Sequence, residues 1–458
     1  MKLRYSFSEK EECQQIHEYS LDILENTGIV VHSEKARSTF KRNGAKLEGK
    51  KVYLPPKIVE DRLVDVPSSF TFNTPGHRVT VGGGTTCTMP PYGATYAKKN
   101  NISHLAGRED FINFTKLSQE SGQMSMACPY VLEPMDVPID FRENYKMAMC
   151  LKYSDKPTFS MTQDGRSARE SIRFAQKFWD CQDSHLLIGN INISAPLIMG
   201  EGTADVILVH GEENQPLMVA CGSGLSGLTA PPLPTSNFLI SNAAVLAGIV
   251  LAQMVRPGLP IVYGFPLFGV NPFNADASPG EPTTALFTMA AAEMGRFYEI
   301  PTRSGGVFTD SRYLDYQSGA ESFMNLFSCL FSGVDCIMHA FGMEDALNTI
   351  NYNKYILDEA LYDTVTHYLN GFEVNAVTLM KDAIKETGCT DNYINMSNLR
   401  LIRKHYHPYP FKNTESEHTI LEASDAIVHE RLENYTAPPL TQAQQKLIEG
   451  CLPREFID

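Results

Sequence analysis

The sequence has few of the features by which common enzyme classes are recognised. It contains one Trp and ten Cys in 458 residues, and no Cys belongs to a Cys-x-x-Cys pair or lies at zinc-ligand spacing from a His. No Gly-x-Ser-x-Gly elbow, His-Glu-x-x-His motif or Cys–His signature occurs. The sequence therefore predicts no bound metal and no evident nucleophile, which favours a reaction whose reactive group comes from outside the chain.

Basic charge is also scarce. Lys and Arg number 39 against 53 Asp and Glu, and the formal net charge of −14 is spread without blocks of like charge. Such a surface argues against a nucleic-acid partner, because phosphates are bound by basic patches. The N-terminus leads into polar residues rather than an apolar leader, and the scattered Cys are typical of reduced thiols. We expect a cytoplasmic protein.

One apolar stretch needs its own explanation. Residues 238–255 carry no formal charge and approach the length that spans a bilayer. The stretch contains Ser241, Asn242, Gln253 and many small residues. We expect a buried helix packed inside a barrel, with no membrane association.

The first hundred residues differ in pattern from the rest. A helix is predicted over 10–27, followed by short β-like runs at 52–54, 70–72 and 79–81 that Pro and Gly separate. This pattern predicts an N-terminal α/β cap over residues 1–106.

From residue 107 the pattern changes to strand, loop and helix, with a capping-box signal at Ser167 and helices expected over 283–298 and 319–332. Such alternation indicates parallel βαβ units, and their number fits a closed (β/α)8 TIM barrel over 107–372 better than an open sheet. A helical C-terminal extension, 373–458, is expected to pack on the barrel or on a second subunit, and we expect a homo-oligomer. The predicted strands are 125–131, 158–162, 186–193, 217–221, 261–265, 302–307 and 334–339, with an eighth around 346–352.

The polar residues at the expected strand ends are the candidates for catalysis or, like Gln163, for substrate binding, because barrel enzymes place their chemistry there. His339 ends the last clear strand, where a catalytic and a structural role are both open. Asp310 follows the preceding strand and is either catalytic or the cap of the next helix. The other polar residues at strand ends are Gln163, Asp164, Asn192, Ser194 and Thr309.

A Gly-x-Gly-x-x-Gly pattern, Gly222 to Gly227, follows the fourth expected strand. A dinucleotide site needs a helix at once after it, whereas here Pro231, Pro232 and Pro234 follow. We therefore expect no nicotinamide, and a loop over the barrel mouth.

Aromatic residues near the same loops suggest a substrate that carries a positive charge. Ring faces bind a methylated ammonium well, although ordinary packing is the alternative for each ring. Arg312 and Arg303 lie near the sixth strand end, where they either hold a carboxylate or form ordinary ion pairs. Backbone amides around Gly305-Gly306 would serve a carboxylate equally well. The rings are Tyr92, Tyr96, Tyr313, Phe341 and Tyr352.

Four stretches, taken together and in order, resemble the trimethylamine methyltransferase family over almost the whole chain. They are Leu21-Asp22-Ile23-Leu24-Glu25-Asn26-Thr27-Gly28-Ile29, Val52-Tyr53-Leu54-Pro55-Pro56, Met135-Asp136-Val137-Pro138 and Ser154-Asp155-Lys156-Pro157-Thr158. The resemblance implies a (β/α)8 barrel over whose mouth a separate corrinoid protein docks.

Founding members of that family carry pyrrolysine, and this chain has only standard residues, so it resembles the non-pyrrolysine branch. That branch implies demethylation of a quaternary amine such as glycine betaine, proline betaine or carnitine, with transfer of the methyl group to the cob(I)alamin of the partner. A quaternary nitrogen leaves as a neutral amine, so the barrel mainly has to hold and aim its substrate. The alternative is a barrel lyase or hydrolase that uses His339 and Asp310 as acid and base.

Overall fold

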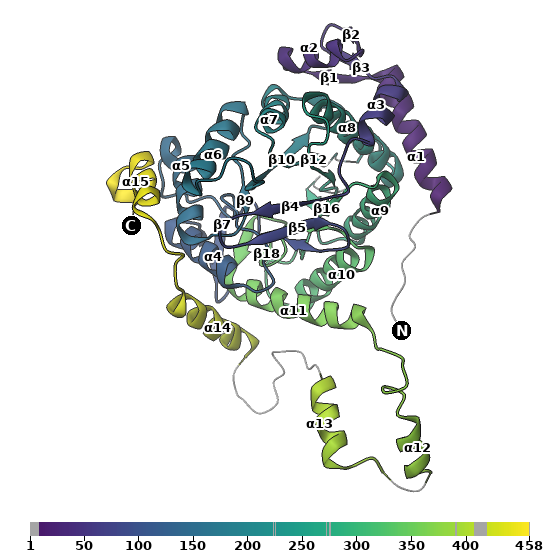
Figure 1. Cartoon of the computed structure of the whole chain (residues 1–458), viewed down its shortest axis with the longest axis vertical. Coiled ribbons are helices and arrows are strands. Elements are labelled where there is room, and N and C mark those ends of the chain that lie inside the picture. The colour runs from purple at the N-terminus through teal and green to yellow at the C-terminus, as the bar shows by residue number, and fades with distance from the viewer. Residues whose placement is uncertain are drawn as a thin grey trace.

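The computed structural model describes residues 9–457 except 223, 225, 272, 274, 275, 390, 391 and 407–418. Its centre is a seven-stranded sheet in the order β6-β17-β16-β13-β12-β10-β9, and every neighbouring pair is parallel. Figure 1 shows this sheet encircled by helices. The strands are β6 (Cys87–Thr88), β9 (Thr158–Phe159), β10 (Leu187–Ile193), β12 (Leu217–Cys221), β13 (Ile261–Gly264), β16 (Thr302–Ser304) and β17 (Cys336–Ile337).

The segment 125–127 closes the sheet into a barrel. The amide of Ser125 donates to the carbonyl of Thr88 at 3.1 Å, and the amide of Ala127 donates to the carbonyl of Pro157 at 2.8 Å. The segment therefore bridges β6 and β9, the two edges of the seven-stranded sheet. With this segment, eight extended parts of the chain surround the barrel, as the alternation of strands and helices predicted.

The strands of the structure differ from the predictions in two places. Cys87–Thr88 lies within the segment expected to form the cap, yet it pairs with β17 in the barrel. The strand expected around 346–352 exists as β19 (Thr349–Asn351), but it pairs with β18 (Met343–Glu344) and β7 (Tyr96–Lys99) rather than with the barrel. With β8 (Ile102–Leu105) these strands form a separate sheet, built from the loops that follow the last and the first barrel strand.

The helices that surround the barrel alternate with its strands, as predicted. Helix α6 begins at Gly165, because Asp164 is its N-cap and accepts a bond from the amide of Ser167 at 2.8 Å. The predicted start at Ser167 was therefore slightly late. The helices are α4 (Arg108–Glu120), α5 (Ile139–Tyr153), α6 (Gly165–Phe178), α7 (Glu201–Glu212), α8 (Pro234–Val255), α9 (Pro282–Tyr298), α10 (Tyr316–Ser332) and α11 (Tyr352–Asn370).

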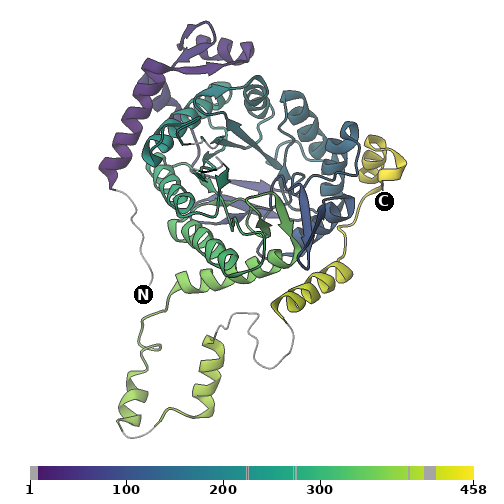
Figure 2. The same cartoon turned by 180° about the vertical axis from the view of Figure 1, so that it is seen from behind.

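The N-terminal residues cover one end and one side of this barrel. The hairpin β4–β5 leads into β6, so it lies at the end where the strands begin, and Figure 1 shows it across the barrel. The strands end on the opposite side, seen in Figure 2. These N-terminal elements are α1 (Lys10–Asp22), the π-helix η1 (Ile23–Thr27), β1 (Ile29–Val31), α2 (Glu34–Arg42), β2 (Lys46–Glu48), β3 (Lys51–Tyr53), α3 (Pro56–Leu63), β4 (Ser69–Asn73) and β5 (Arg78–Gly82).

Helix α8 contains the apolar stretch that the sequence analysis singled out. It is the one helix among the described residues long and apolar enough to cross a membrane, and 78% of its apolar window is buried. It packs between strand β12 and the N-terminal helices α1, α2 and α3. The predicted burial of this helix is confirmed, although it lies between the barrel wall and the N-terminal elements.

The C-terminal residues fall into two parts. Helices α14 (Ile420–Asn434) and α15 (Gln442–Cys451) pack on the barrel helices α4, α5, α6 and α11. Before them, α12 (Lys381–Thr387) and α13 (Met396–His405) bury none of their residues. Figures 1 and 2 show α12 and α13 projecting away from the barrel. The remaining short elements are β11 (Ile198–Met199), β14 (Gly269–Val270), β15 (Ala277–Ser278) and η2 (Arg454–Phe456).

Candidate active site

Strand alternation determines which side chains enter the barrel. On β10, Ile193 lies against Gly248 of the surrounding helix α8, so Asn190 and Asn192 point to the inside. On β16, Thr302 and Ser304 bond to groups outside the sheet, which leaves Arg303 inside. The interior near the strand ends is therefore polar on two sides, where a small substrate can be bound.

Arg303 is the most unusual of these inner residues. Its side chain is buried, with 3% of the residue exposed, and its Nη2 lies 2.8 Å from the sulfur of Met338. Its Nε has no hydrogen-bond partner, and no carboxylate in the described part of the chain pairs with it. Burial lowers its pKa to about 10. A buried guanidinium without a counterion is costly, and an anionic ligand would offset that cost.

His339 follows β17 and is held in a left-handed backbone conformation, with φ of 52°. Its Nδ1 accepts a hydrogen bond from the amide of Tyr92 at 3.3 Å, and its ring lies 5.4 Å from that of Phe308. Burial first, and then the charge of Arg303, lower the pKa of His339 to about 3. The imidazole is therefore neutral at physiological pH, and its proton is on Nε2 because Nδ1 is the acceptor.

Two stacked tyrosine rings form an aromatic wall near His339, whose Nδ1 accepts from the amide of one of them, Tyr92. The rings of Tyr92 and Tyr130 stack with centroids 4.6 Å apart, and burial raises the pKa of both hydroxyls. The Tyr130 hydroxyl donates to Oε1 of Gln163 at 2.9 Å, which brings Gln163 to the same wall. Tyr130 is not among the residues predicted for the site, because it falls in an apolar run that predicts only a strand.

Asp310 lies in a loop after β16 and holds a neighbouring hairpin. It accepts bonds from the Ser278 hydroxyl and from the amide of Gly280, the latter at 2.9 Å. Burial raises the pKa of its carboxyl group. These partners connect the loop to the hairpin β14–β15, so Asp310 and His339 have different partners in this structure.

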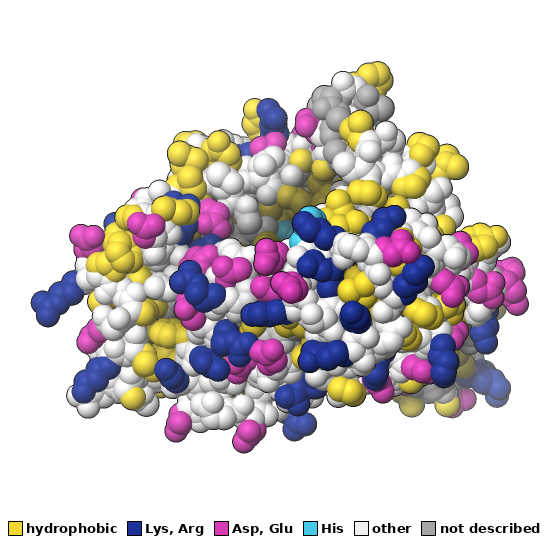
Figure 3. Space-filling view, turned by 90° about the horizontal axis from the view of Figure 1, so that it is seen from above, with side chains coloured by type: hydrophobic (Ala, Val, Ile, Leu, Met, Phe, Trp, Pro, Cys, Tyr) yellow, Lys and Arg dark blue, Asp and Glu magenta, His cyan; other side chains and the backbone are white. Residues whose placement is uncertain are grey.

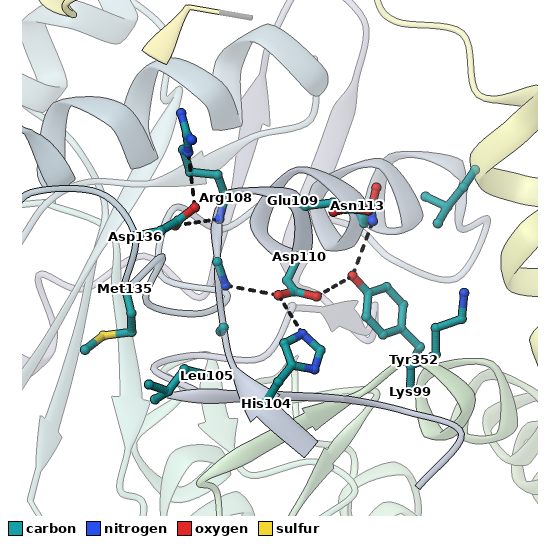
Figure 4. Close-up of a pocket in the computed structure, with 13 residues that line it drawn as sticks. Lys99, His104, Leu105, Arg108, Glu109, Asp110, Asn113, Met135, Asp136 and Tyr352 are labelled. Atoms are coloured by element: carbon teal, nitrogen blue, oxygen red, sulfur yellow. Dashed lines mark hydrogen bonds and ion pairs between the residues drawn. The ribbon is translucent and has the colours of Figure 1, made fainter. Parts of the chain in front are cut away.

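Two of the predicted substrate residues pack away from Arg303. Phe341 is fully buried, with its ring 5.7 Å from that of Tyr355. Tyr352 donates to Oδ1 of Asp110 at 2.9 Å and stacks on Phe114 with centroids 4.2 Å apart. Figure 4 shows Tyr352 in a pocket that His104 and Arg108 also line. The volume of this pocket is about 670 Å³, and none of its lining residues lies at the end of a barrel strand.

The other three predicted residues lie at the surface. Tyr96 is 41% exposed on β7, and Tyr313 is 61% exposed with the ammonium of Lys98 5.5 Å from its ring centroid. The Nε of Arg312 pairs with Asp345 at 2.8 Å in an exposed setting. Of the two arginines considered for a carboxylate, only Arg303 is thus both buried and without an acidic partner among the described residues.

No group of three or more His, Cys, Asp or Glu suited to a metal ion occurs within the described ranges. Arg303, His339, Tyr92, Tyr130 and Asn190 can hold a small molecule by charge, by ring faces and by amide groups. The described part of this mouth contains no Ser–His or Cys–His pair, so the arrangement favours binding and orientation over covalent catalysis.

Comparison with known proteins identifies the family of this chain. The family described as Trimethylamine methyltransferase (MTTB) matches residues 3–454, so the chain belongs to that family. It is therefore an enzyme of the corrinoid-dependent methyltransferase class, built on a (β/α)8 barrel with additional N-terminal sheets and C-terminal helices.

Three relatives share most of their length with this chain. A glycine betaine methyltransferase of Desulfitobacterium hafniense is 31% identical over 87% of this chain and 84% of its own. A proline betaine:corrinoid methyltransferase of Eubacterium limosum is 29% identical, with 96% of each chain covered. An L-carnitine:corrinoid methyltransferase of the same organism is 27% identical over 98% of this chain and 97% of its own.

Proposed function

We propose that this protein removes a methyl group from a betaine-type quaternary amine and transfers it to the Co(I) corrinoid of a separate partner protein. The observation that carries the proposal is Arg303, a buried guanidinium in the barrel that has no carboxylate of the described chain beside it. The family and the names of its relatives support the reaction class, and Arg303 supports a substrate that brings its own carboxylate.

The groups around Arg303 suit the other end of such a substrate. The ring of Tyr92 offers a π surface to a methylated ammonium, which cannot donate a hydrogen bond. Its stacking partner Tyr130 already has the ammonium of Lys146 4.6 Å from its ring centroid, so Tyr130 supports Tyr92 rather than binding the cation itself. His339 is neutral, so it does not repel the cation. With the carboxylate on Arg303 and the ammonium near the rings, one methyl group can be held in a fixed direction.

The proposed reaction asks for little acid–base chemistry. Cob(I)alamin on the partner supplies the electron pair for the new cobalt–carbon bond. The carbon–nitrogen bond breaks, and the nitrogen keeps its electron pair and leaves as a neutral tertiary amine. No proton has to move in this step. The residues of this chain bind the substrate, orient it and exclude water, which agrees with the low pKa of His339.

The partner is expected to dock over the end where the strands finish. Several large side chains at that end are exposed: Phe273 (96%) and Leu228 (67%) lie in loops, and Tyr316 (92%) is the first residue of α10. Large apolar groups at a surface mark an interaction site when they gather around a functional centre. The side of the barrel in Figure 3, by contrast, mixes acidic and basic side chains.

The test mixes the purified protein with glycine betaine, proline betaine or carnitine and cob(I)alamin kept reduced by titanium(III) citrate. We expect the absorption spectrum of methylcobalamin with at least one of the three, and the demethylated amine in equal amount. Trimethylamine and a reaction without protein are the controls. A folded protein that methylates cobalamin from none of these quaternary amines, or equally well from trimethylamine, would overturn the proposal.

A further inference from the structure

An arm, described over residues 371–389 and 392–406, leaves the barrel after α11 and carries α12 and α13. Neither helix buries a single residue. Even so, much of the arm is apolar and exposed to solvent. The exposed apolar side chains are Phe372, Val374, Val377, Leu379, Met380, Ile384, Tyr393, Ile394, Met396, Leu399, Leu401, Ile402 and Tyr406.

Helix α13 has an apolar face that the described residues of its own chain leave exposed. Met396, Leu399 and Ile402 follow one another at intervals of three residues and are 68%, 37% and 61% exposed. Isolated helices shorter than about 12–15 residues are marginal in water, and most helices in proteins depend on packing of such a face. A ten-residue helix like α13 therefore needs a surface that covers it.

A groove between α1, α8 and α9 provides a matching surface. Its volume is about 380 Å³, and its lining is mostly apolar. Leu286 stands in it with 50% of its surface exposed. The lining residues include Ile16, Phe238, Leu286, Phe287, Ala290 and Met294.

The charges of helix and groove are complementary. Helix α13 carries Arg400, Arg403 and Lys404 and has no acidic residue. Helix α1, one wall of the groove, exposes Glu11, Glu12, Glu18 and Asp22 against a single Lys10. The groove lining contains Glu12 and Glu293 and no basic residue. On a chain of net charge −14, a basic helix is suited to an acidic surface of the chain itself.

In this structure α13 does not lie in the groove of its own molecule. The two ends of the arm are anchored by α11 and α14, and both views show α13 at the opposite end of the molecule from α1. We propose that α13 of one subunit docks in the α1–α8–α9 groove of a second copy of this chain. The exchange is reciprocal, as the symmetry of a two-fold dimer requires.

The test measures the mass of the full-length protein in solution by sedimentation across a dilution series. We expect a mass of twice the 51.0 kDa of one chain. The double variant Leu399→Asp/Ile402→Asp changes the arm, and Leu286→Asp changes the groove. Each is expected to halve the mass. Val64→Asp, at an apolar position 82% exposed and outside both surfaces, should leave it unchanged. Circular dichroism checks that each variant is folded.

Mixing the arm variant with the groove variant makes the test specific. The mixture restores one intact pairing, the normal arm of the groove variant in the normal groove of the arm variant, so mass should rise above that of either alone. A monomeric wild-type protein, or an arm variant that keeps the wild-type mass, overturns the proposal. A loss of corrinoid-protein binding with the mass unchanged would assign the arm to that partner and also overturn it.

Discussion

The backbone amide of Tyr92 donates to Nδ1 of His339 at 3.3 Å and thereby joins the loop after β6 to the loop after β17. These strands are neighbours in the barrel although 247 residues separate the two partners in sequence. The bond fixes the tautomer of the imidazole, so Nε2 is left as a donor. His339 is thus a neutral polar group in a site that also contains the charge of Arg303.

The pKa of His339 leads to a prediction about stability in acid. The folded protein holds this pKa at about 3 and that of the buried His210 at about 4, both below the ordinary 6.5. As pH falls below 6.5, the unfolded chain takes up protons that these native imidazoles do not. The free energy of unfolding should therefore fall by roughly 1.4 kcal/mol per pH unit for each of them until the folded pKa is reached.

Urea unfolding between pH 7.5 and 5 measures this slope. His339→Asn removes one group that takes up a proton on unfolding, so it should reduce the slope by about 1.4 kcal/mol per pH unit. His210→Asn is the matched variant for a buried imidazole outside the site, because His210 is fully buried on α7. It should reduce the slope by the same amount. An unchanged slope in His339→Asn would mean that His339 titrates freely in the folded protein.

Arg303 is expected to favour function at the expense of stability. Arg303→Met removes an unpaired buried charge, so the free enzyme should become more stable by about 1–2 kcal/mol. The same change should lower kcat/KM for a betaine by about 10- to 100-fold, the value of a charge-assisted hydrogen bond of about 1.5–3 kcal/mol.

The betaine methyl ester and tetramethylammonium are the comparison substrates, and Arg303→Met should not reduce their rates. Arg312→Met is the matched variant, because Arg312 is exposed and paired with Asp345. Equal losses for the carboxylate and its ester would show that Arg303 does not hold the carboxylate.

A buried ion pair connects the loops on either side of His339. The ammonium of Lys354 lies 2.7 Å from Asp358, and Asp358 accepts from the amide of Gly342 at 2.7 Å. Lys354 also donates to the carbonyl of Val307 at 3.3 Å. Lys354→Met leaves a buried carboxylate alone and should cost about 3–5 kcal/mol of unfolding free energy.

The double variant Lys354→Met/Asp358→Leu removes both charges and shows whether the loss comes from the unpaired charge or from packing. It should recover most of the lost unfolding free energy, because neither charge remains buried without its partner. Chemical denaturation of the three proteins at one pH decides the point. A double variant as unstable as the single one would assign the loss to packing instead.

The sequence predicts the barrel well where its strands are long and apolar. Strands such as β12 are buried on both faces, so an uninterrupted apolar run identifies them. Strand β6 has only two residues, in a stretch rich in Gly and Thr, and such a strand becomes visible only through its pairing with β17. The strand expected near residue 350 exists, but its short run of residues does not reveal which strands it pairs with.

The site is predictable only in part, for a similar reason. His339 stands at a strand end, and its position follows from the strand. Whether Phe341 and Tyr352 face the mouth depends on the path of the loop, and here it turns them into the surrounding packing. The burial of Arg303 follows from strand alternation, whereas its lack of a carboxylate partner depends on loops whose course the sequence does not give.

The last prediction concerns the surface where the corrinoid protein is expected to dock. Phe273 lies in a loop beyond the strand ends, and Tyr316 begins α10. Both are almost fully exposed, so they are available to a partner over the mouth. Phe273→Asp and Tyr316→Asp should raise the KM for the corrinoid protein about ten-fold or more each, since exposed aromatic anchors often contribute over 1 kcal/mol to an interface. Neither change should alter the rate with free cob(I)alamin, which needs no docking. Val64→Asp, on the N-terminal side of the molecule, is the control for an added charge. Equal losses with free and protein-bound corrinoid would place these two residues in substrate binding rather than in docking.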